Sequence, residues 1–459
     1  MASGNTGALF TDLYELTMLQ AYHDAALQDV AVFELFVRTL PPQRNFLVAA
    51  GLDDVLSYLE GLAFGEGDLE YLTSLNLFSP SFLDYLHDFR FTGSVRAVPE
   101  GTVVFANEPI LEVSGPISEA QLVETYLLDQ VNFQTHIASN GARVVEAAPG
   151  RPVVDFGARR AHGGDAGLKA ARALYISGYA STSLVDAGQR YGIPVAGTMA
   201  HSYVQVYPQE IDAFRSFAAT YPQTTLLVDT YDTKGGVRNV VQLAHDLGRD
   251  FKVRSVRLDS GDLVELAKRT RRILDEAGLS QVQVFASGGL DEYEVHRIVQ
   301  AGAPVNGFGV GTNVVVSADA PKFDSAYKLV AYGGKGLMKL STGKATLPGP
   351  KQVFRRYHDG IAETDVIARD EEHLAGEPLL QTVMAGGRRL PSSVEPLDAI
   401  RQRARRQVES LPTRLRGLEQ AFPAYPVEVS AGLQTAERVL RDSLEQTGLR
   451  EPRPVSGPG

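Results

Sequence analysis

The sequence contains no cysteine and no tryptophan among its 459 residues. Without cysteine, the chain cannot form disulfides, thiolate zinc sites, iron–sulfur clusters or a cysteine nucleophile. Positive charge is also scarce, because 44 Lys and Arg residues stand against 55 Asp and Glu residues, which gives a formal net charge of −11. This balance argues against a general nucleic-acid-binding protein, since a phosphate backbone attracts excess cations. An anionic small substrate is compatible with it only if cations gather in one pocket.

Long apolar runs are missing as well. No window approaches the roughly 18 uncharged apolar residues that mark a membrane-spanning helix. The N-terminal stretch MASGNTGALFTDLYELTM lacks the basic and apolar regions of a signal peptide. We therefore expect a cytoplasmic protein with no membrane partner and no nucleic-acid partner.

Short apolar runs alternate with helical stretches from about residue 150 onward. Such alternation is typical of βα units with a parallel sheet, and six units favour a barrel over an open doubly wound sheet, which stays the alternative. The six runs are 152–156, 193–197, 225–229, 255–259, 282–286 and 305–310.

The remaining segments predict a second domain of mixed α+β type. Residues 30–38 read as a strand, residues 326–357 as antiparallel strands, and residues 393–450 as charged helices. The fold class expected is α/β, an irregular TIM-like barrel beside this second domain. The expected divisions are an N-terminal α+β domain (1–117), the barrel with the active site (118–325), a β and helical segment that packs with the N-terminal domain (326–450), and a disordered tail (451–459).

Small, polar or charged residues follow each apolar run at once. In a parallel barrel these positions share one rim, the carboxyl end of the strands, where active sites form. We therefore expect the residues of six separate segments to form one site. The residues in question are Arg159, Arg160, Thr198, His201, Asp229, Asp232, Asp259, Asp262, Ser287, Gly288, Gly289, Gly309, Gly311 and Thr312.

Glycine-rich turns end the last two predicted strands, at Ser287–Gly289 and at Gly309–Thr312. Glycine lets backbone N–H groups approach a phosphate closely, and a helix N-terminus favours an anion. We favour phosphate binding at these turns over ordinary βα connections. The chain has no GxxxxGK[ST] motif, which argues against a P-loop nucleotide site.

The charged rim residues have a functional and a structural interpretation. Arg159, Arg160 and Arg257 fit an anionic ligand, or else salt bridges to Asp155 or Asp259. The aspartates at 229, 232, 259 and 262 fit Mg²⁺ together with a phosphate, or else helix caps. Three lysines in a turn-rich loop, Lys339, Lys344 and Lys351, fit either phosphate binding or a solvated loop.

His201 is the histidine that directly follows a predicted strand at the rim. Imidazole there could act as a general base, as a metal ligand or as a nucleophile that accepts a phosphoryl group. Metal binding is the weakest of these because no HxH or HExxH pattern is present. Tyr14 and Phe156 are candidate faces for a flat heteroaromatic substrate, although a core position is the commoner role for single aromatic residues.

Long motifs in one order make the chain resemble the nicotinate phosphoribosyltransferases, a family of type II phosphoribosyltransferases. The resemblance runs from about residue 9 to about residue 356, and the last hundred or so residues carry little of it. The motifs are TDLYELTM, FELFVRTLPPQRNFLVAAGL, DFGARRAHGGDAGLKAARALYISGYASTS, YGIPVAGTMAHSYV, VDTYDT, VRLDSGDL, FASGGLDEY, GFGVGT and MKLSTGKATLPGPKQVFR.

The resemblance implies a reaction and its reactants. Nicotinate and phosphoribosyl pyrophosphate would give nicotinate mononucleotide and pyrophosphate, a step of NAD salvage, with ATP hydrolysis coupled to it and Mg²⁺ required. It also implies a homodimer in which Tyr14 is donated across the interface. The metal ligands are left open.

The resemblance also implies roles for single residues. His201 would be transiently phosphorylated by ATP, Thr198 and Arg257 would contact the nicotinate carboxylate, and Asp259 would serve the ribose hydroxyls or the metal. Phe156 and Tyr14 would cover the two faces of the pyridine ring, and Arg159 would approach the phosphates or the carboxylate. The 5′-phosphate would be held by Ser287, Gly288, Gly289, Gly309, Gly311 and Thr312.

One stretch bears on substrate choice. The related nicotinamide enzyme has an aspartate that accepts a hydrogen bond from the amide, whereas residues 180–183 here, which include Thr182, contain no acid. A missing negative charge suits the nicotinate anion, so Thr182 is counted among the substrate-binding candidates. The alternatives are a nicotinamide or quinolinate phosphoribosyltransferase, a non-catalytic metabolite-binding member of the family, or a sugar-phosphate isomerase barrel.

Overall fold

The computed structural model describes residues 7–341 and 346–446, and the chain divides into two compact units. The first comprises residues 1–135, 322–415 and 419–459, and the second residues 136–321 and 416–418. The domain boundaries after residues 117 and 325 stay predictions, and the first division between the two units lies inside helix α6 (Glu124–Ala147). The tail 451–459 lies outside the described residues.

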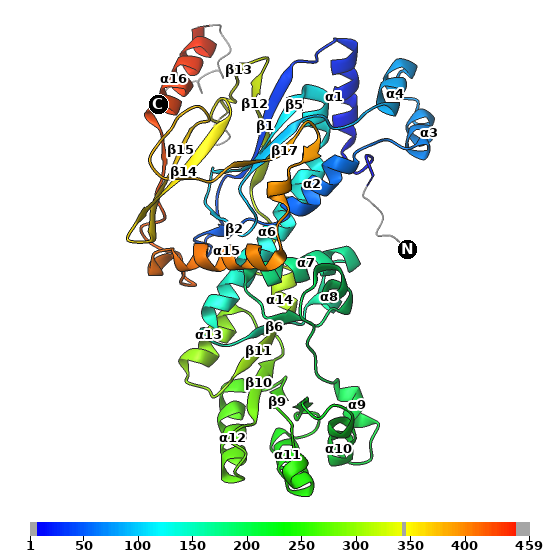
Figure 1. The fold of residues 1–459 in the computed structure, drawn as a ribbon, viewed down its shortest axis with the longest axis vertical. Coiled ribbons are helices and arrows are strands. Elements are labelled where there is room, and N and C mark those ends of the chain that lie inside the picture. The colour runs from blue at the N-terminus through cyan, green and yellow to red at the C-terminus, as the bar shows by residue number, and fades with distance from the viewer. Residues whose placement is uncertain (1–6, 342–345, 447–459) are drawn as a thin grey trace, which may run out of the picture. The chain divides into compact units, whose positions relative to one another are not determined.

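The first unit is built on a seven-stranded sheet with the order β13-β12-β1-β5-β3-β17-β18 (Figure 1). Strand β1 (Val30–Val37), inside this sheet, is almost continuously apolar and pairs antiparallel with β5 and β12, so early and late parts of the sequence share one sheet. The other strands are β3 (Ser94–Ala97), β5 (Pro109–Pro116), β12 (Ser325–Tyr332), β13 (Lys335–Gly336), β17 (Gln381–Ala385) and β18 (Arg388–Arg389).

Two smaller sheets and seven helices complete the described part of this unit. The four-stranded sheet contains β16 (Glu377–Pro378), β14 (Lys351–His358), β15 (Ile361–Arg369) and β19 (Val427–Val429), and the two-stranded sheet β2 (Leu47–Val48) and β4 (Val103–Val104). The helices are α1 (Leu13–Asp24), α2 (Leu52–Gly61), α3 (Glu66–Ser74), α4 (Pro80–His87), α5 (Ile117–Leu122), α15 (Leu397–Glu409) and α16 (Ala431–Gln446).

The second unit is a parallel α/β half-barrel, which gives the chain its α/β class (Figure 1). Its sheet has the order β7-β6-β11-β10-β9-β8, formed by β6 (Val153–Asp155), β7 (Ser181–Thr182), β8 (Thr225–Leu227), β9 (Ser255–Leu258), β10 (Gln283–Ser287) and β11 (Gly307–Val310). The run 193–197 forms no strand, because only Val195 makes a bridge, to Thr182.

Helices follow the strands of the half-barrel, as βα units require. They are α7 (Gly164–Ser177), α8 (Val185–Tyr191), α9 (His201–Gln205), α10 (Glu210–Thr220), α11 (Thr233–Leu247), α12 (Leu263–Glu276), α13 (Glu292–Gln300) and α14 (Thr312–Val315), with a 3-10 turn η1 (Ala158–Arg160) after β6.

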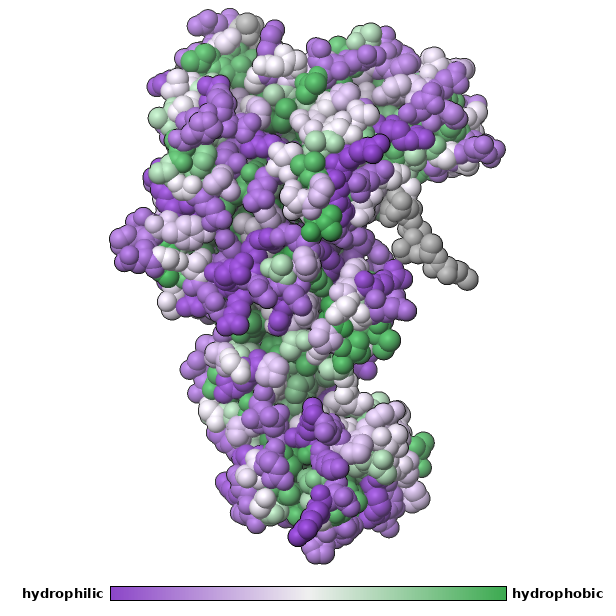
Figure 2. All heavy atoms as spheres, in the orientation of Figure 1, coloured by the Kyte–Doolittle hydropathy of each residue, from purple (hydrophilic) through white to green (hydrophobic). Residues whose placement is uncertain are grey.

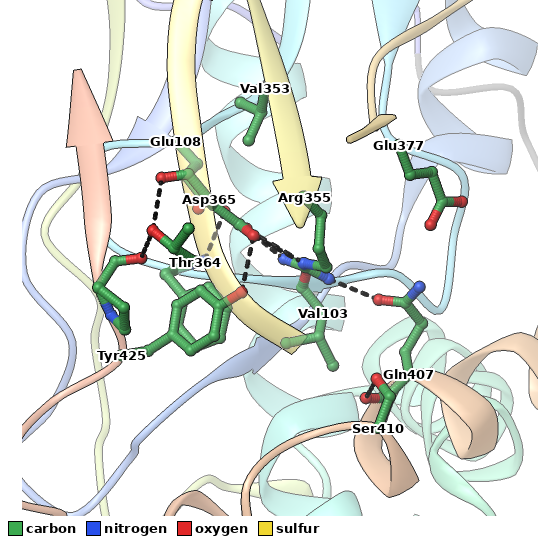
Figure 3. Close-up of polar contacts among 12 residues, drawn as sticks. Val103, Glu108, Val353, Arg355, Thr364, Asp365, Glu377, Gln407, Ser410 and Tyr425 are labelled. Atoms are coloured by element: carbon green, nitrogen blue, oxygen red, sulfur yellow. Dashed lines mark hydrogen bonds and ion pairs between the residues drawn. The ribbon is translucent and has the colours of Figure 1, made fainter. Parts of the chain in front are cut away.

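A buried ionic network fixes the four-stranded sheet of the first unit (Figure 3). Arg355 and Asp365 are fully buried and form an ion pair between β14 and β15. The remaining donors of Arg355 reach Gln407 Oε1 at 2.6 Å and the carbonyl of Val103 at 2.9 Å, while the Tyr425 hydroxyl donates to Asp365 Oδ1 at 2.8 Å. The charges of Arg355 and Asp365 thus compensate each other inside the core, as buried charges require.

Hydrophilic side chains predominate on the face of the molecule that Figure 2 shows. None of the helices in the described ranges is long and apolar enough to cross a membrane. The apolar side chains that drive folding are mainly buried beneath this surface.

Candidate active site

The carboxyl ends of the parallel strands carry the predicted polar residues. Phe156 follows β6, Asp229 follows β8, Asp259 follows β9, and Ser287 ends β10. Parallel strands point the same way, so these residues lie along one edge of the sheet. Hydrogen bonds between residues far apart in the sequence show that several of them form one constellation.

Arg257, on β9, is the centre of this constellation. Its Nε donates to the Ser287 hydroxyl at 2.8 Å, its Nη1 to the Thr198 hydroxyl at 2.6 Å, and its Nη2 to Asp259 Oδ1 at 2.9 Å. The structural alternative for Arg257, a salt bridge to Asp259, is therefore present. The same bonds orient the guanidinium and bring Thr198 beside it, so the pair predicted to contact one carboxylate is adjacent.

Asp259 is held in its ionised form. Burial works to raise the pKa of its carboxyl, but hydrogen bonds from Ser287 and Arg257 and the charges of Arg257 and His201 outweigh burial and lower the pKa. Its backbone N–H donates to Asp229 Oδ2 at 2.9 Å. The rim therefore keeps a fixed negative charge beside its arginine.

His201 begins helix α9 and remains partly exposed. Its Nδ1 lies 3.1 Å from the Thr230 hydroxyl, and its Nε2 lies 3.8 Å from Asp259 Oδ2. The Thr230 contact fixes the orientation of the ring and leaves Nε2 on the side of the carboxylate. The sequence analysis did not single out Thr230 as a partner of His201, although it stands in the VDTYDT motif.

Phe156 lies beside the arginine. The Arg257 guanidinium carbon is 5.5 Å from the centre of the Phe156 ring. A Cβ atom at Gly309 would come within 2.4 Å of that ring, so the glycine makes room for the aromatic side chain. Gly309, predicted for phosphate, is itself buried in β11.

The two glycine-rich turns differ in what they offer a ligand. The Ser287 hydroxyl is already engaged, because it accepts from Arg257 and donates to Asp259 Oδ1 at 2.6 Å. Within the described chain, the backbone N–H groups of Gly288 and Gly289 donate to no acceptor. Thr312 is exposed at the first turn of α14, where helix N–H groups lack partners. These turns thus offer a ligand their backbone N–H groups rather than the Ser287 hydroxyl.

The other arginines and Thr182 occupy contrasting positions. Arg159 and Arg160 are exposed in η1, and neither forms a salt bridge with a described residue, so the structural alternative for them is not met in the described ranges. Thr182 is buried, and its hydroxyl donates to Asp155 Oδ2 at 2.7 Å. The sequence analysis treated Asp155 only as a possible salt-bridge partner of an arginine.

Two of the four rim aspartates are helix caps. Asp232 Oδ2 accepts from the N–H of Gly235 at 2.7 Å, and Asp262 Oδ1 accepts from the N–H groups of Val264 and Glu265. Asp229 accepts from Ser260 and Asp259 through Oδ2, whereas its buried Oδ1 meets no hydrogen-bond partner among the described residues. Asp229 therefore has a buried carboxylate oxygen open to a ligand, whereas Asp232 and Asp262 each use one oxygen for a helix cap.

Of the three lysines predicted to lie in one loop, Lys351 has neither of the roles considered for it, phosphate binding or a place in a solvated loop. Lys351 is buried in the first unit, where its Nζ pairs with Glu34 at 2.8 Å and donates to the carbonyl of Gly349. A buried, paired ammonium cannot attract phosphate from solvent, and the partner, distant in sequence, gave no local signal. Lys339 is exposed, and Lys344 lies outside the described residues.

Tyr14 lies on α1 of the first unit and is half exposed. Phe10 and Leu13 beside it are exposed as well. Next to it, Glu15 is fully buried, and neither of its carboxylate oxygens has a hydrogen-bond partner in the described chain. Burial raises the pKa of Glu15 to about 7.

Comparisons with known proteins agree with the resemblance seen in the motifs. The N-terminal domain of nicotinate phosphoribosyltransferase (NAPRTase) matches residues 9–132, and the NAPRTase family matches residues 152–338. A nicotinate phosphoribosyltransferase of Mycobacterium tuberculosis is 54% identical over 426 residues, which cover 93% of this chain and 92% of the relative. One of Bacillus subtilis is 41% identical over 82% of this chain and 78% of the relative.

A solved structure extends the similarity to the fold. The crystal structure of human nicotinic acid phosphoribosyltransferase superposes with a TM-score of 0.83 at 30% identity, over 94% of this chain and 99% of that chain.

Proposed function

Because the chain belongs to the nicotinate phosphoribosyltransferase family, we propose that it joins nicotinate to phosphoribosyl pyrophosphate in NAD salvage. The products are nicotinate mononucleotide and pyrophosphate. The observation that carries this proposal is the Arg257–Thr198 pair beside the Phe156 ring at the carboxyl end of the sheet. This arrangement offers donors for a carboxylate next to a face for an aromatic ring.

Nicotinate binds with its carboxylate at Arg257 and Thr198 and with its ring on Phe156. Tyr14 of a second copy of the chain covers the other face, in a homodimer that buries the exposed residues around it. Thr182 shapes the wall of this pocket through its bond to Asp155. Mixing a Tyr14→Ala variant with a His201→Ala variant tests the shared site: activity regained on mixing supports it, and none regained contradicts it.

Phosphoribosyl pyrophosphate binds across the two glycine-rich turns. The N–H groups of Gly288, Gly289 and Thr312 hold the 5′-phosphate, and Gly309 and Gly311 support this site by leaving room for Phe156 and the backbone of Gly157. Arg159, exposed and without a salt-bridge partner among the described residues, approaches the phosphates, and Asp259 faces the ribose hydroxyls. The concentration of donors explains how an acidic chain binds an anion.

The transfer needs no strong base. Pyrophosphate leaves the anomeric carbon with its bonding electron pair, positive charge develops on the ribose, and the lone pair of the pyridine nitrogen forms the new bond. The site's task is to orient the ring, stabilise the departing charge and exclude water. Arg257 fixes the ring by its carboxylate, and Phe156 fixes its plane.

His201 couples ATP to the transfer reaction. The Nε2 lone pair attacks the terminal phosphorus of ATP, ADP leaves, and a phosphohistidine forms. Thr230 holds Nδ1, so Nε2 is the nitrogen that reacts. Hydrolysis of the phosphohistidine alters the affinity for phosphoribosyl pyrophosphate and drives the reaction toward product.

Mg²⁺ fits the carboxylates that remain open. Asp229 Oδ1 is buried without a hydrogen-bond partner in the described chain, and Asp259 Oδ2 faces the same rim. No group of three or more His, Cys, Asp or Glu side chains in the described ranges could hold a metal ion. Asp229 and Asp259 would hold the ion together with substrate phosphates, where it would neutralise the charge of the pyrophosphate.

A product assay with and without ATP tests the proposal. The wild type should form nicotinate mononucleotide faster and further with ATP, and His201→Ala should lose this stimulation while slow transfer remains. Product-coupled ATP hydrolysis by His201→Ala would contradict the phosphohistidine. Turnover of nicotinamide or quinolinate in preference to nicotinate would favour the alternative enzymes, and no pyrophosphate release would favour a non-catalytic role. We expect these reactions in the cytoplasm, and cell fractionation checks this.

A further inference from the structure

Asn313, the second residue of α14, joins the two turns that frame the proposed phosphate site. Its side-chain Nδ2 donates to the carbonyl of Gly289 at 3.1 Å and approaches that of Leu290 at 3.4 Å. One turn follows β10 and the other follows β11, and these neighbouring strands pair at Ser287 and Gly309. A single side chain therefore closes the gap that opens where the two strands end.

Among the described residues, Asn313 provides the hydrogen bond that the glycines of the turn after β10 receive. Gly288 and Gly289 both have positive φ, at 95° and 65°, and both are exposed. Their N–H groups have no acceptor within the described chain. A turn with free donors and flexible glycines loses conformational entropy when it binds an anion, unless another contact already fixes it.

A second asparagine ties the same two segments together deeper in the unit. Asn140 of α6 is buried and donates to Asp319, beyond α14, at 2.8 Å, and it lies 3.4 Å from Glu292, the first residue of α13. Arg143 holds the same Glu292 carboxylate at 3.1 Å. The base of both segments is thus fixed, and Asn313 is the contact at the open end.

We propose that Asn313 is a positioning residue for phosphoribosyl pyrophosphate, which sets the spacing between the two rows of backbone N–H groups that receive the 5′-phosphate. This inference rests on the proposed function. Only a donor can satisfy two carbonyl oxygens, so aspartate, which is nearly isosteric, removes the bonds and adds a negative charge next to the phosphate.

The chain offers a matched control at the opposite end of the same strand pair. Asn306 precedes β11, and its side-chain Oδ1 accepts from the N–H of Val284 at 2.9 Å. Asn306 therefore also ties β10 to β11 through a side-chain amide, but at the amino ends of the strands, away from the rim.

Steady-state kinetics of Asn313→Ala, Asn313→Asp and Asn306→Ala test the inference. We expect the KM for phosphoribosyl pyrophosphate to rise about tenfold in Asn313→Ala and further in Asn313→Asp. The kcat and the KM for nicotinate should change less than about threefold, and Asn306→Ala should keep both KM values.

An unchanged KM for phosphoribosyl pyrophosphate in both Asn313 variants would overturn the inference, as would an equal rise in Asn306→Ala. These results are distinct from a failure of the proposed function, in which the wild type itself would form no nicotinate mononucleotide.

Discussion

Two arginine–aspartate pairs in this chain have the same chemistry and opposite roles. Arg355 and Asp365 in the first unit are fully buried, and their other hydrogen bonds go to the carbonyl of Val103, Gln407 and Tyr425. Arg257 and Asp259 in the second unit keep 11% and 25% of their side-chain surface exposed. A saturated buried pair can only stabilise the fold, whereas a pair at an open rim can exchange partners with a ligand.

The largest effect should come from the buried pair. Arg355→Lys removes the planar fork that contacts Asp365, Gln407 and Val103, so a buried carboxylate loses part of its compensation. We expect the free energy of unfolding to fall by about 3 kcal/mol, measured by urea denaturation. The folded fraction should keep its kcat/KM. A variant as stable as the wild type would show that the network contributes little.

The same substitution at the rim should affect catalysis instead. Arg257→Lys keeps the charge but loses the fork that orients Thr198, Ser287 and Asp259 together. We expect kcat/KM to fall about 100-fold or more, while the free energy of unfolding falls by about 1 to 2 kcal/mol, less than in Arg355→Lys. If both variants lost activity and stability in the same proportion, the two arginines would not have separate catalytic and structural roles.

Glu15 extends the comparison to a buried carboxylate that has no arginine. Its pKa is raised to about 7, so the folded state binds a proton that the unfolded state releases at lower pH. Deprotonation of the buried Glu15 carboxyl lowers the free energy of unfolding. This loss is absent below the pKa that Glu15 has in the unfolded chain, and it is fully present once the pH exceeds about 7. Glu15→Gln should therefore raise the free energy of unfolding by about 2 kcal/mol at pH 8.5 and change it little at pH 4.

Denaturation curves at the two pH values check this expectation. A gain of the same size at both would mean that folding does not raise the pKa of Glu15.

The smallest effect should come from a rim aspartate that caps a helix. Asp262→Ala removes the acceptor for the first turn of α12 and should cost about 1 kcal/mol of unfolding free energy. The kcat/KM should stay within about twofold of the wild type at any Mg²⁺ concentration. A rise in the Mg²⁺ requirement would instead place Asp262 among the metal ligands.

Sequence order predicted the rim because parallel strands deliver the residues after them to one edge. That rule placed Asp259 and Ser287 at one edge of the sheet, where Arg257 bonds to both. Thr198 follows a run that forms no strand, and the roles of Thr198, Phe156 and Arg257 in binding nicotinate came from the family resemblance and stay predictions. The α/β class with a parallel sheet followed from the same alternation of apolar runs and helices. The run 193–197 was wrong as a strand because apolar composition alone does not provide a pairing partner.

Pairings between distant residues could not be predicted. Lys351 looked like a loop lysine, but Glu34, 317 positions away, holds it in the core. The Ser287 hydroxyl looked free for phosphate, yet it bridges Arg257 and Asp259. Such roles depend on which buried group needs a partner, and local sequence does not carry that information.

Gly288 carries no functional group, yet it sets how closely the turn after β10 can approach the backbone of Asp259. A Cβ atom there would come within 1.9 Å of the carbonyl oxygen of Asp259, so a single methyl group would push the backbone that carries the carboxylate. Asp259 contacts Arg257, Ser287 and His201, and the displacement would reach each of them. A screen of random substitutions would thus rank this glycine with the reactive residues, because a missing side chain holds their spacing.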